Sequence, residues 1–76
     1  MTTNETIGML MRKHRKEKKM TIQEVADRMG KAKNSVSLLE LGKTGIEIET
    51  LQKYCDVIGY DWITLIKEAD DLSSGE

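Results

Sequence analysis

Residues 21–42 read Thr21-Ile-Gln-Glu-Val-Ala-Asp-Arg-Met-Gly-Lys-Ala-Lys-Asn-Ser-Val-Ser-Leu-Leu-Glu-Leu-Gly42, which contains the signals for two short helices in quick succession. Thr21 and Glu24 have the spacing of a capping box, in which each side chain binds the backbone N–H of the other residue at the start of a helix. Gly30 ends this helix, because glycine enters the left-handed conformation without the strain that a side chain causes. A second helix is expected over residues 33–41, ending at Gly42. The sequence therefore predicts a helix-turn-helix, an arrangement that presents its second helix to the major groove of DNA.

Helical spacing of apolar residues predicts three further helices, over about residues 5–18, 47–58 and from 62 onward. Thr3 or Asn4 is expected to cap the first of them, and Asp61 the last. The chain has no proline, three aromatic residues and little strand-like alternation, so nothing indicates a sheet. The residues expected on inward faces are Ile7, Leu10 or Met11, His14, Val25, Ala26, Met29, Val36, Leu39, Glu40, Ile48, Leu51, Tyr54, Cys55, Ile58, Trp62, Leu65 and Ile66. We therefore expect an all-α, compact five-helix domain over residues 1–69, followed by a disordered acidic tail over residues 70–76.

Composition places this chain among small single-domain proteins. A chain of 76 residues buries only about 60% of its unfolded surface, so it has room for one small core. The single cysteine excludes an internal disulfide, and no Cys/His cluster has zinc-ligand spacing, so neither a metal nor a cofactor is expected. No apolar run approaches the roughly 20 residues of a membrane span, and the start of the chain lacks the features of a signal peptide. A soluble, cytoplasmic protein is therefore expected, with no contact to a membrane.

The side chains with reactive groups have structural interpretations. Cys55 is expected to be a small buried group rather than a nucleophile, because no histidine lies at a spacing that suggests pairing. His14 lies on the inward face of the first helix, where a hydrogen-bonded core histidine is commoner than a pH sensor or a metal ligand. No carboxylate pair, nucleophile with a base or phosphate-binding loop is recognisable, so the chain is not expected to be an enzyme.

Charge is distributed unevenly along the chain. The net charge is −1, yet residues 1–43 hold ten lysines and arginines against five acidic residues, a balance of +5. Residues 44–76 hold two lysines against eight acidic residues, a balance of −6. A molecule with one basic end attracts phosphate groups to that end, and the basic run over residues 12–19 is expected to contribute to this attraction.

The order and spacing of several fragments resemble the small lambda-repressor-like, Cro-type helix-turn-helix domains, known as the XRE family. The resemblance covers nearly the whole chain without an insertion. The fragments that carry it are Ile7-Gly8 with Arg12 and Arg15, Thr21-x-x-Glu-Val-Ala-x-x-Met-Gly30, Ser35-Val-Ser37, Glu40-x-Gly-Lys43, Ile48-Glu-Thr-Leu-x-Lys53 and Ile58-Gly59. The resemblance implies a sequence-specific regulator of transcription that binds duplex DNA, of the phage or prophage repressor type. A homodimer is expected, because one helix that reads a few base pairs rarely gives enough specificity.

The resemblance also implies which residues contact DNA. The second helix of the motif enters the major groove, and the residues expected to face the bases are Lys33, Asn34, Ser35, Ser37 and Leu38. The start of the first helix of the motif and the loop after the second contact the sugar-phosphate backbone. The residues expected there are Gln23, with the neighbouring backbone amides, Lys31, Lys43 and Thr44.

Three apolar residues leave a second interpretation open. Ile22, Leu38 and Leu41 occupy positions where this family often has polar or basic side chains. Either the leucines contact thymine methyl groups and form a dimer seam, or this surface binds another regulatory protein. In the second case the chain is a protein-docking modulator, such as an antirepressor or an antitoxin-like protein.

Overall fold

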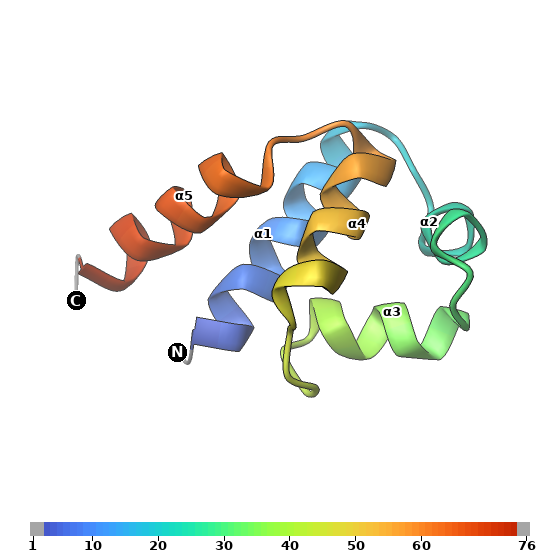
Figure 1. Cartoon of the computed structure of the whole chain (residues 1–76), viewed down its shortest axis with the longest axis horizontal. Coiled ribbons are helices and arrows are strands. Elements are labelled where there is room, and N and C mark those ends of the chain that lie inside the picture. Colours follow the sequence, from blue (N-terminus) through green and yellow to red (C-terminus); the bar gives the residue numbers. More distant parts are fainter. Residues whose placement is uncertain (1–2, 75–76) are drawn as a thin grey trace.

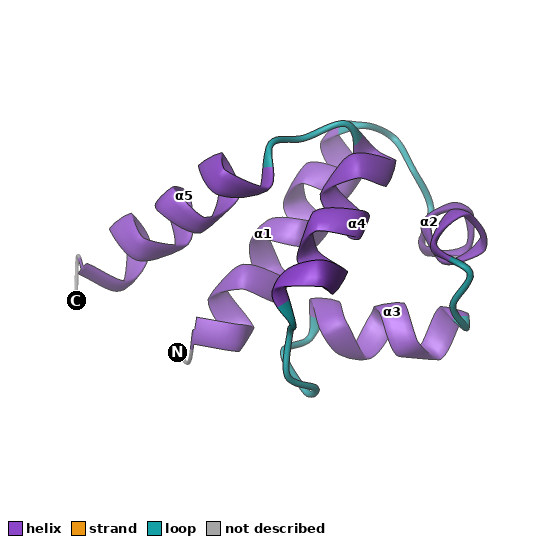
Figure 2. Ribbon diagram, viewed as in Figure 1, coloured by secondary structure: helices purple, strands orange, loops and turns teal. Residues whose placement is uncertain are grey.

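Five α-helices form the computed structural model, which describes residues 3–74 (Figure 1, Figure 2). In chain order they are α1 (Thr3–Glu17), α2 (Ile22–Met29), α3 (Lys33–Glu40), α4 (Ile48–Ile58) and α5 (Trp62–Ser74). Within the described range all regular secondary structure is helical, which confirms the predicted all-α fold.

The capping box and the two glycines of the helix-turn-helix act where the local signals predict. The Thr21 side chain accepts the Glu24 N–H at 3.1 Å, and the Glu24 carboxylate accepts the Thr21 N–H at 3.2 Å, so the capping box is complete. Gly30 follows α2 with φ +69°, and Gly42 lies just after α3 with φ +70°. Both angles fall in the left-handed region that favours glycine, so these two residues allow the chain to leave each helix without strain.

Other helix ends differ from the prediction. α1 already includes Thr3 and Asn4, so neither residue caps it from outside as predicted. α3 ends at Glu40, one residue before the predicted Leu41. Asp61 does cap α5, because its carboxylate accepts the Thr64 N–H at 3.2 Å. The predicted disordered tail is wrong for residues 70–74, which continue α5, while residues 75–76 lie outside the described residues.

α1 and α4 pack side by side at the centre of the molecule (Figure 1). α5 packs against α1 and α4 on one side, and α2 contacts α4 on the other. α3 contacts α1 and α2 and lies at the lower right in Figure 1, below α2. This arrangement leaves one long face of α3 at the outside of the molecule.

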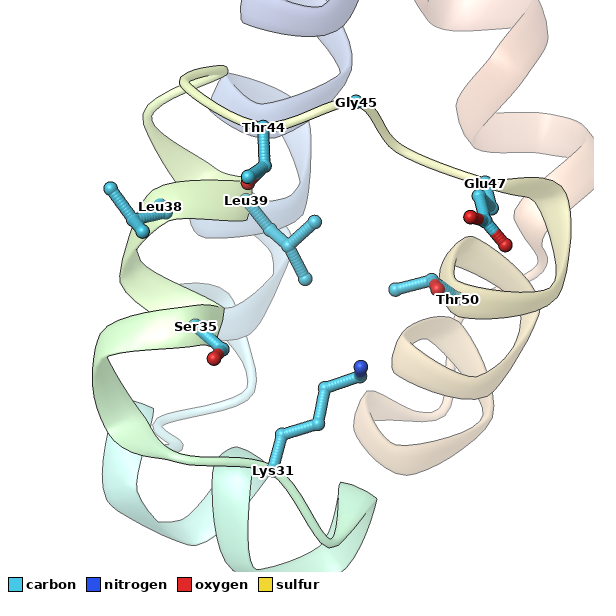
Figure 3. A pocket seen from close by; sticks show the side chains of 8 residues that line it. All are labelled: Lys31, Ser35, Leu38, Leu39, Thr44, Gly45, Glu47 and Thr50. Atoms are coloured by element: carbon cyan, nitrogen blue, oxygen red, sulfur yellow. The ribbon is translucent and has the colours of Figure 1, made fainter.

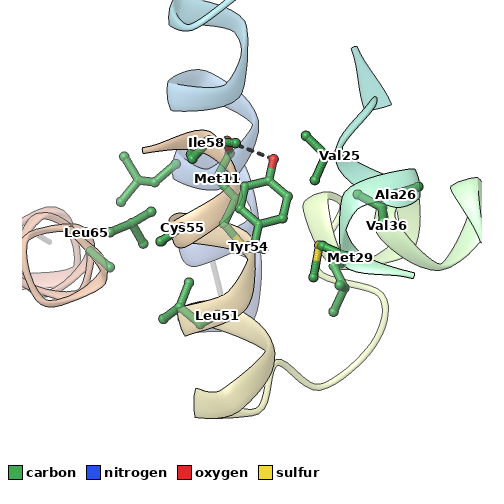
Figure 4. Packing of buried hydrophobic residues seen from close by; sticks show 13 residues of the cluster. Met11, Val25, Ala26, Met29, Val36, Leu51, Tyr54, Cys55, Ile58 and Leu65 are labelled. Atoms are coloured by element: carbon green, nitrogen blue, oxygen red, sulfur yellow. Dashed lines mark hydrogen bonds between the residues drawn. The ribbon is translucent and has the colours of Figure 1, made fainter. Parts of the chain in front are cut away.

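A single core fills the space between the helices (Figure 4). Its buried apolar residues are Leu10, Met11, Val25, Ala26, Met29, Val36, Leu39, Leu51, Tyr54, Cys55, Ile58, Leu65 and Ala69. The sequence does not predict Ala69, and it predicts Leu10 and Met11 as alternatives although both are buried. The other core residues are predicted, as are Ile7, Trp62 and Ile66, which are partly buried against the same core. The prediction for Ile48 is wrong, since this residue is 60% exposed at the first position of α4. Burial of Cys55 is confirmed, and it raises the pKa of the thiol to about 11.

Gly8 lets α1 approach the end of α3 closely. A Cβ atom at this position would lie 2.5 Å from the carbonyl oxygen of Leu39 and 2.6 Å from that of Glu40. Any larger residue would have to push the two helices apart, because backbone atoms of a packed helix cannot move independently. The small residue therefore fixes how near the carboxyl end of α3 lies to α1.

A polar cluster joins α1 to α5 around His14, whose predicted burial and hydrogen bonding are confirmed. Its Nδ1 lies 2.8 Å from Glu17 Oε1, and its Nε2 lies 3.1 Å from Glu68 Oε1. The imidazole stacks on the ring of Tyr60 at a centroid distance of 3.8 Å, and the Tyr60 hydroxyl donates a hydrogen bond to Glu68. That hydrogen bond raises the pKa of Tyr60 to about 12 and lowers the pKa of Glu68.

The described residues contain neither a membrane-spanning helix nor a cluster of metal ligands. Among residues 3–74, no helix combines the length and the apolar character that a membrane crossing requires. Over the same residues, no three His, Cys, Asp or Glu side chains gather in a way that would hold a metal ion.

Candidate nucleic-acid interface

α3 is held from behind by a buried ion pair. Arg15 of α1 is 6% exposed and Glu40 of α3 is 5% exposed. The Arg15 guanidinium donates to the Glu40 carboxylate twice, from Nε to Oε2 at 2.8 Å and from Nη2 to Oε1 at 3.1 Å. Its Nη1 donates to the Met20 carbonyl at 2.7 Å, just before α2 begins. One buried side chain therefore connects α1, α3 and the segment that leads into the helix-turn-helix.

Tyr54 of α4 adds a third helix to this network. Its hydroxyl lies 2.6 Å from Glu40 Oε2 and 3.1 Å from the Met11 carbonyl, the contact drawn in Figure 4. Because a hydroxyl carries one proton, the shorter contact with the charged oxygen is the stronger of the two. Burial, and then the hydrogen bond to Glu40, raises the pKa of Tyr54, while the hydrogen bond to Glu40 raises the pKa of Arg15. Arg15 therefore stays charged and Tyr54 neutral near pH 7.

The sequence predicts the inward position of Glu40 but not its partners. Some residues of the basic run 12–19 are predicted to attract phosphates, but Arg15 is not available for this, because its guanidinium is buried and hydrogen-bonded to Glu40 and the Met20 carbonyl. Arg15 and Glu40 are 25 residues apart in the chain, and local sequence patterns do not predict a contact between residues so far apart. Only the packing of α1 on α3 brings them together.

The opposite face of α3 is open to solvent. Lys33, Asn34 and Ser35 are exposed, Leu38 is 42% exposed, and Ser37 is half-buried. The structure therefore brings the five residues predicted to face the bases onto the outer side of one helix. On the inner side of the same helix lie Val36, Leu39 and Glu40, all buried, so α3 presents one face only.

A groove runs between α3 and the start of α4 (Figure 3). It has a volume of about 330 Å³ and is lined by Lys31, Ser35, Leu38, Leu39, Thr44, Gly45, Glu47 and Thr50. Lys31 enters it from one end and Thr44 from the other, and Leu38 lies at its outer rim. Two of the predicted phosphate-contacting residues thus border the exposed face of α3. The sequence does not predict Glu47 or Thr50 as walls of a groove.

A second, smaller groove of about 160 Å³ lies beside α3, toward α1 and the start of α2. Arg12, Ile22, Ser37 and Leu41 line it together with the buried ion pair. Arg12 is exposed and stays available to an anion, unlike Arg15. Ile22 is half-buried and packs against the core, so much of this predicted protein-contact residue is covered by its own chain.

The remaining predicted phosphate contacts are Gln23 and Lys43, and both residues are exposed. The Gln23 side chain is already engaged, because its amide nitrogen donates to Asp27 Oδ1 at 2.8 Å on the same helix. Its backbone N–H lies in the first turn of α2, where the helix supplies no carbonyl partner and an anion binds readily. Lys43 follows α3 in the loop that leads to Thr44, beside the first groove.

Comparisons with known proteins identify the family. The profile of the helix-turn-helix family HTH_3 matches residues 11–65, and the chain belongs to this family, which agrees with the XRE-type resemblance of its sequence. The fold is similar to the crystal structure of the clp gene regulator ClgR from C. glutamicum, with a TM-score of 0.89 and 25% identity, over 93% of this chain and 92% of that chain. Another crystal structure of ClgR from Corynebacterium glutamicum gives a TM-score of 0.91 and 24% identity, over 97% of this chain and 79% of that chain. No curated protein sequence matches the chain.

The family and the fold are those of DNA-binding transcriptional regulators and not of enzymes. Within that class, α2 and α3 form the helix-turn-helix, and the outer face of α3 with its two flanking grooves is the candidate interface.

Proposed function

We propose that this protein is a transcriptional repressor of the phage or prophage type that reads a specific duplex DNA sequence with the outer face of α3. The observation that carries the proposal is the contrast between the two faces of that helix. Its inner face is fixed by the buried Arg15–Glu40–Tyr54 network, while Lys33 and Asn34 lie exposed at its start. A rigid helix with free hydrogen-bonding side chains is what base recognition in the major groove requires.

The exposed side chains have the chemistry for two kinds of contact. Lys33 donates to the acceptors on the edge of guanine, and Asn34 forms paired hydrogen bonds with adenine. Lys31, Lys43 and Thr44 supply charge and hydrogen-bond donors beside the phosphate backbone, which fixes the register without reading the sequence. In this proposal the residues beside α3 provide most of the affinity for DNA, and the exposed face of α3 provides the preference for one base sequence.

The proposal includes a homodimer that acts in the cytoplasm. One helix contacts only a few base pairs, and two copies related by a two-fold axis double the length of the site. The two α3 helices would then enter successive major grooves, about 34 Å apart on one side of the duplex. The expected operator is therefore a pseudo-palindrome.

Selection from a pool of random duplexes, followed by binding measurements at several salt concentrations, tests this proposal. Lys33→Ala and Asn34→Ala should each weaken binding to the selected duplex by about 1–3 kcal/mol, and should relax the preference at one base position. Lys67→Ala is the matched control, because it removes a lysine charge from α5, which does not contact α3. Equal effects of Lys33→Ala and Lys67→Ala, or a failure to select any duplex, would contradict the proposal.

The exposed leucines favour a second candidate function, binding to another regulatory protein. Leu38 is 42% exposed and Leu41 is 51% exposed. Leu38 lines the first groove, and Leu41 lines the second groove together with the half-buried Ile22. A modulator of this kind would capture its partner regulator in a pull-down, and Leu38→Arg would abolish the capture. It would show no preference among duplexes in the selection described above.

A further inference from the structure

The two exposed leucines of the α3 region lie on the side of the helix that faces away from the core. Leu39, between them in sequence, is buried, and the core side of α3 is already filled by Val36 and Glu40. Leu38 and Leu41 therefore contribute little to the packing of their own chain. An apolar side chain in such a place stabilises the molecule only when a binding partner covers it and removes it from water.

The surroundings of these leucines favour DNA over a protein partner. Asn34 lies one turn before Leu38 on the same face, Lys31 and Thr44 line the groove beside Leu38, and Arg12 lines the groove beside Leu41. Leu38 and Leu41 are each only about half exposed, at 42% and 51%, so they form a much smaller apolar area than the roughly 800 Å² that each partner in a stable protein interface buries. Each groove also holds one carboxylate, but Glu40 is paired with Arg15, and Glu47 lies across the first groove from Leu38, just before α4 (Figure 3). A small apolar patch with donors and positive charges beside it suits a polyanion that carries isolated apolar groups.

The major groove offers one apolar group to such a patch, the 5-methyl group of thymine. We propose that Leu38 and Leu41 are specificity-determining residues that recognise thymine methyl groups in the operator. This inference rests on the proposed DNA-binding function. It adds that the carboxyl-terminal part of the exposed face, which holds Leu38 and Leu41, recognises thymine. Asn34 and Lys33 then read hydrogen-bonding edges, while the leucines read methyl groups.

Helix geometry sets the spacing of these contacts. Asn34, Leu38 and Leu41 follow one another at i, i+4 and i+7, which places them about 6 Å and about 10 Å along the helix axis from the first. Base pairs are spaced about 3.4 Å apart along the duplex. When α3 lies along the groove, the leucines therefore meet bases about two to three pairs beyond the one that Asn34 contacts.

Replacement of thymine by deoxyuridine tests the proposal, because it removes the methyl group and leaves every hydrogen-bonding group in place. Each thymine of a duplex selected by the wild-type protein is replaced in turn, and affinity is measured by fluorescence anisotropy. We expect about a fourfold loss at one or two positions in each half-site, the factor that corresponds to burial of one methyl group. With Leu38→Ala the loss at one of these positions should disappear, and with Leu41→Ala the loss at its neighbour.

Ile63→Ala is the matched control, since Ile63 is an exposed apolar residue on α5, which does not contact α3. This variant should keep the full sensitivity to deoxyuridine. The proposal is overturned if the selected duplex tolerates deoxyuridine at every position, or if the penalty is the same in Leu38→Ala, Leu41→Ala and wild type. In both cases selective binding remains, so the proposed function stands. A protein that selects no duplex overturns both proposals together.

Discussion

Glu40→Gln removes the charge that the buried Arg15 guanidinium faces, and it leaves the volume of the side chain nearly unchanged. Both partners are almost inaccessible to water, so no solvent replaces the lost charge. Removing one partner of a buried ion pair typically costs about 3–5 kcal/mol. The glutamine oxygen still accepts one hydrogen bond, so we expect the low end of that range, about 3 kcal/mol. A domain of 76 residues has a total free energy of unfolding of about 4–11 kcal/mol, so this is a large fraction of it.

Urea denaturation followed by circular dichroism at 222 nm measures this loss in four proteins: wild type, Glu40→Gln, Arg15→Met and the double variant. The double variant removes both charges, so it should lose at least about 1 kcal/mol less than the sum of the two single variants. Glu49→Gln makes the same chemical change at an exposed position on α4 and should cost less than about 1 kcal/mol.

Two results would refute this account of the buried pair. One is a loss of less than about 1 kcal/mol for Glu40→Gln, which would mean that water or another group already compensates Arg15. The other is additivity of the two single changes, because residues in direct contact in one network should couple.

Three further outcomes follow from the structure. Gly8→Ala should lower the free energy of unfolding in urea denaturation by about 2 kcal/mol, since the new Cβ would lie 2.5 Å from a carbonyl oxygen of α3. Gly45→Ala, whose new Cβ would meet nothing within 4 Å, should change the same free energy by less than about 0.5 kcal/mol. The lowered pKa of Glu68 contributes stability that is present above pH 4.5 and is lost as the pH falls below it, whereas the raised pKa of Tyr60 contributes stability that is present below pH 10 and is lost between pH 10 and about 12. Urea midpoints across this pH range should show both losses. Tyr60→Phe should reduce the alkaline loss without abolishing it, because the raised pKa values of Tyr54 and Cys55 also contribute stability that is lost at high pH. An alkaline loss of the same size in Tyr60→Phe and wild type would contradict the assignment. Cys55, with its thiol pKa raised to about 11, should not react with a thiol reagent at pH 8 until the protein unfolds, and rapid reaction of the native protein would contradict its burial.

The sequence predicts the helix-turn-helix well because its signals are local. Thr21 and Glu24 are three residues apart, and Gly30 acts through its own backbone angle, so these features need no partner elsewhere in the chain. The inward faces are predicted for the same reason, because helical spacing determines which residues share a side. The exposed position of Lys33 and Asn34 follows from this spacing as well.

The prediction of a disordered tail shows where local composition misleads. Asp70 and Asp71 suggest a solvated segment, yet both lie on the exposed side of α5 while Ala69 is buried in the core. The helix continues past the acidic residues to Ser74, which composition alone does not reveal. Ile48 shows the reverse case, because its spacing predicts burial but no neighbouring helix covers the first position of α4.

The amino-acid order by itself determined the five helices, their inward faces and the outward side of α3, since each of these depends on residues within about one or two helical turns. Only the tertiary structure decided that Arg15 belongs to the core rather than to the basic surface, that Gly8 sets the crossing of α1 on α3, and that Ile22 is partly covered by the core. These features arise from contacts between helices far apart in the chain. Such contacts depend on how the faces of different helices pack against one another, and the local spacing of residues does not predict that packing.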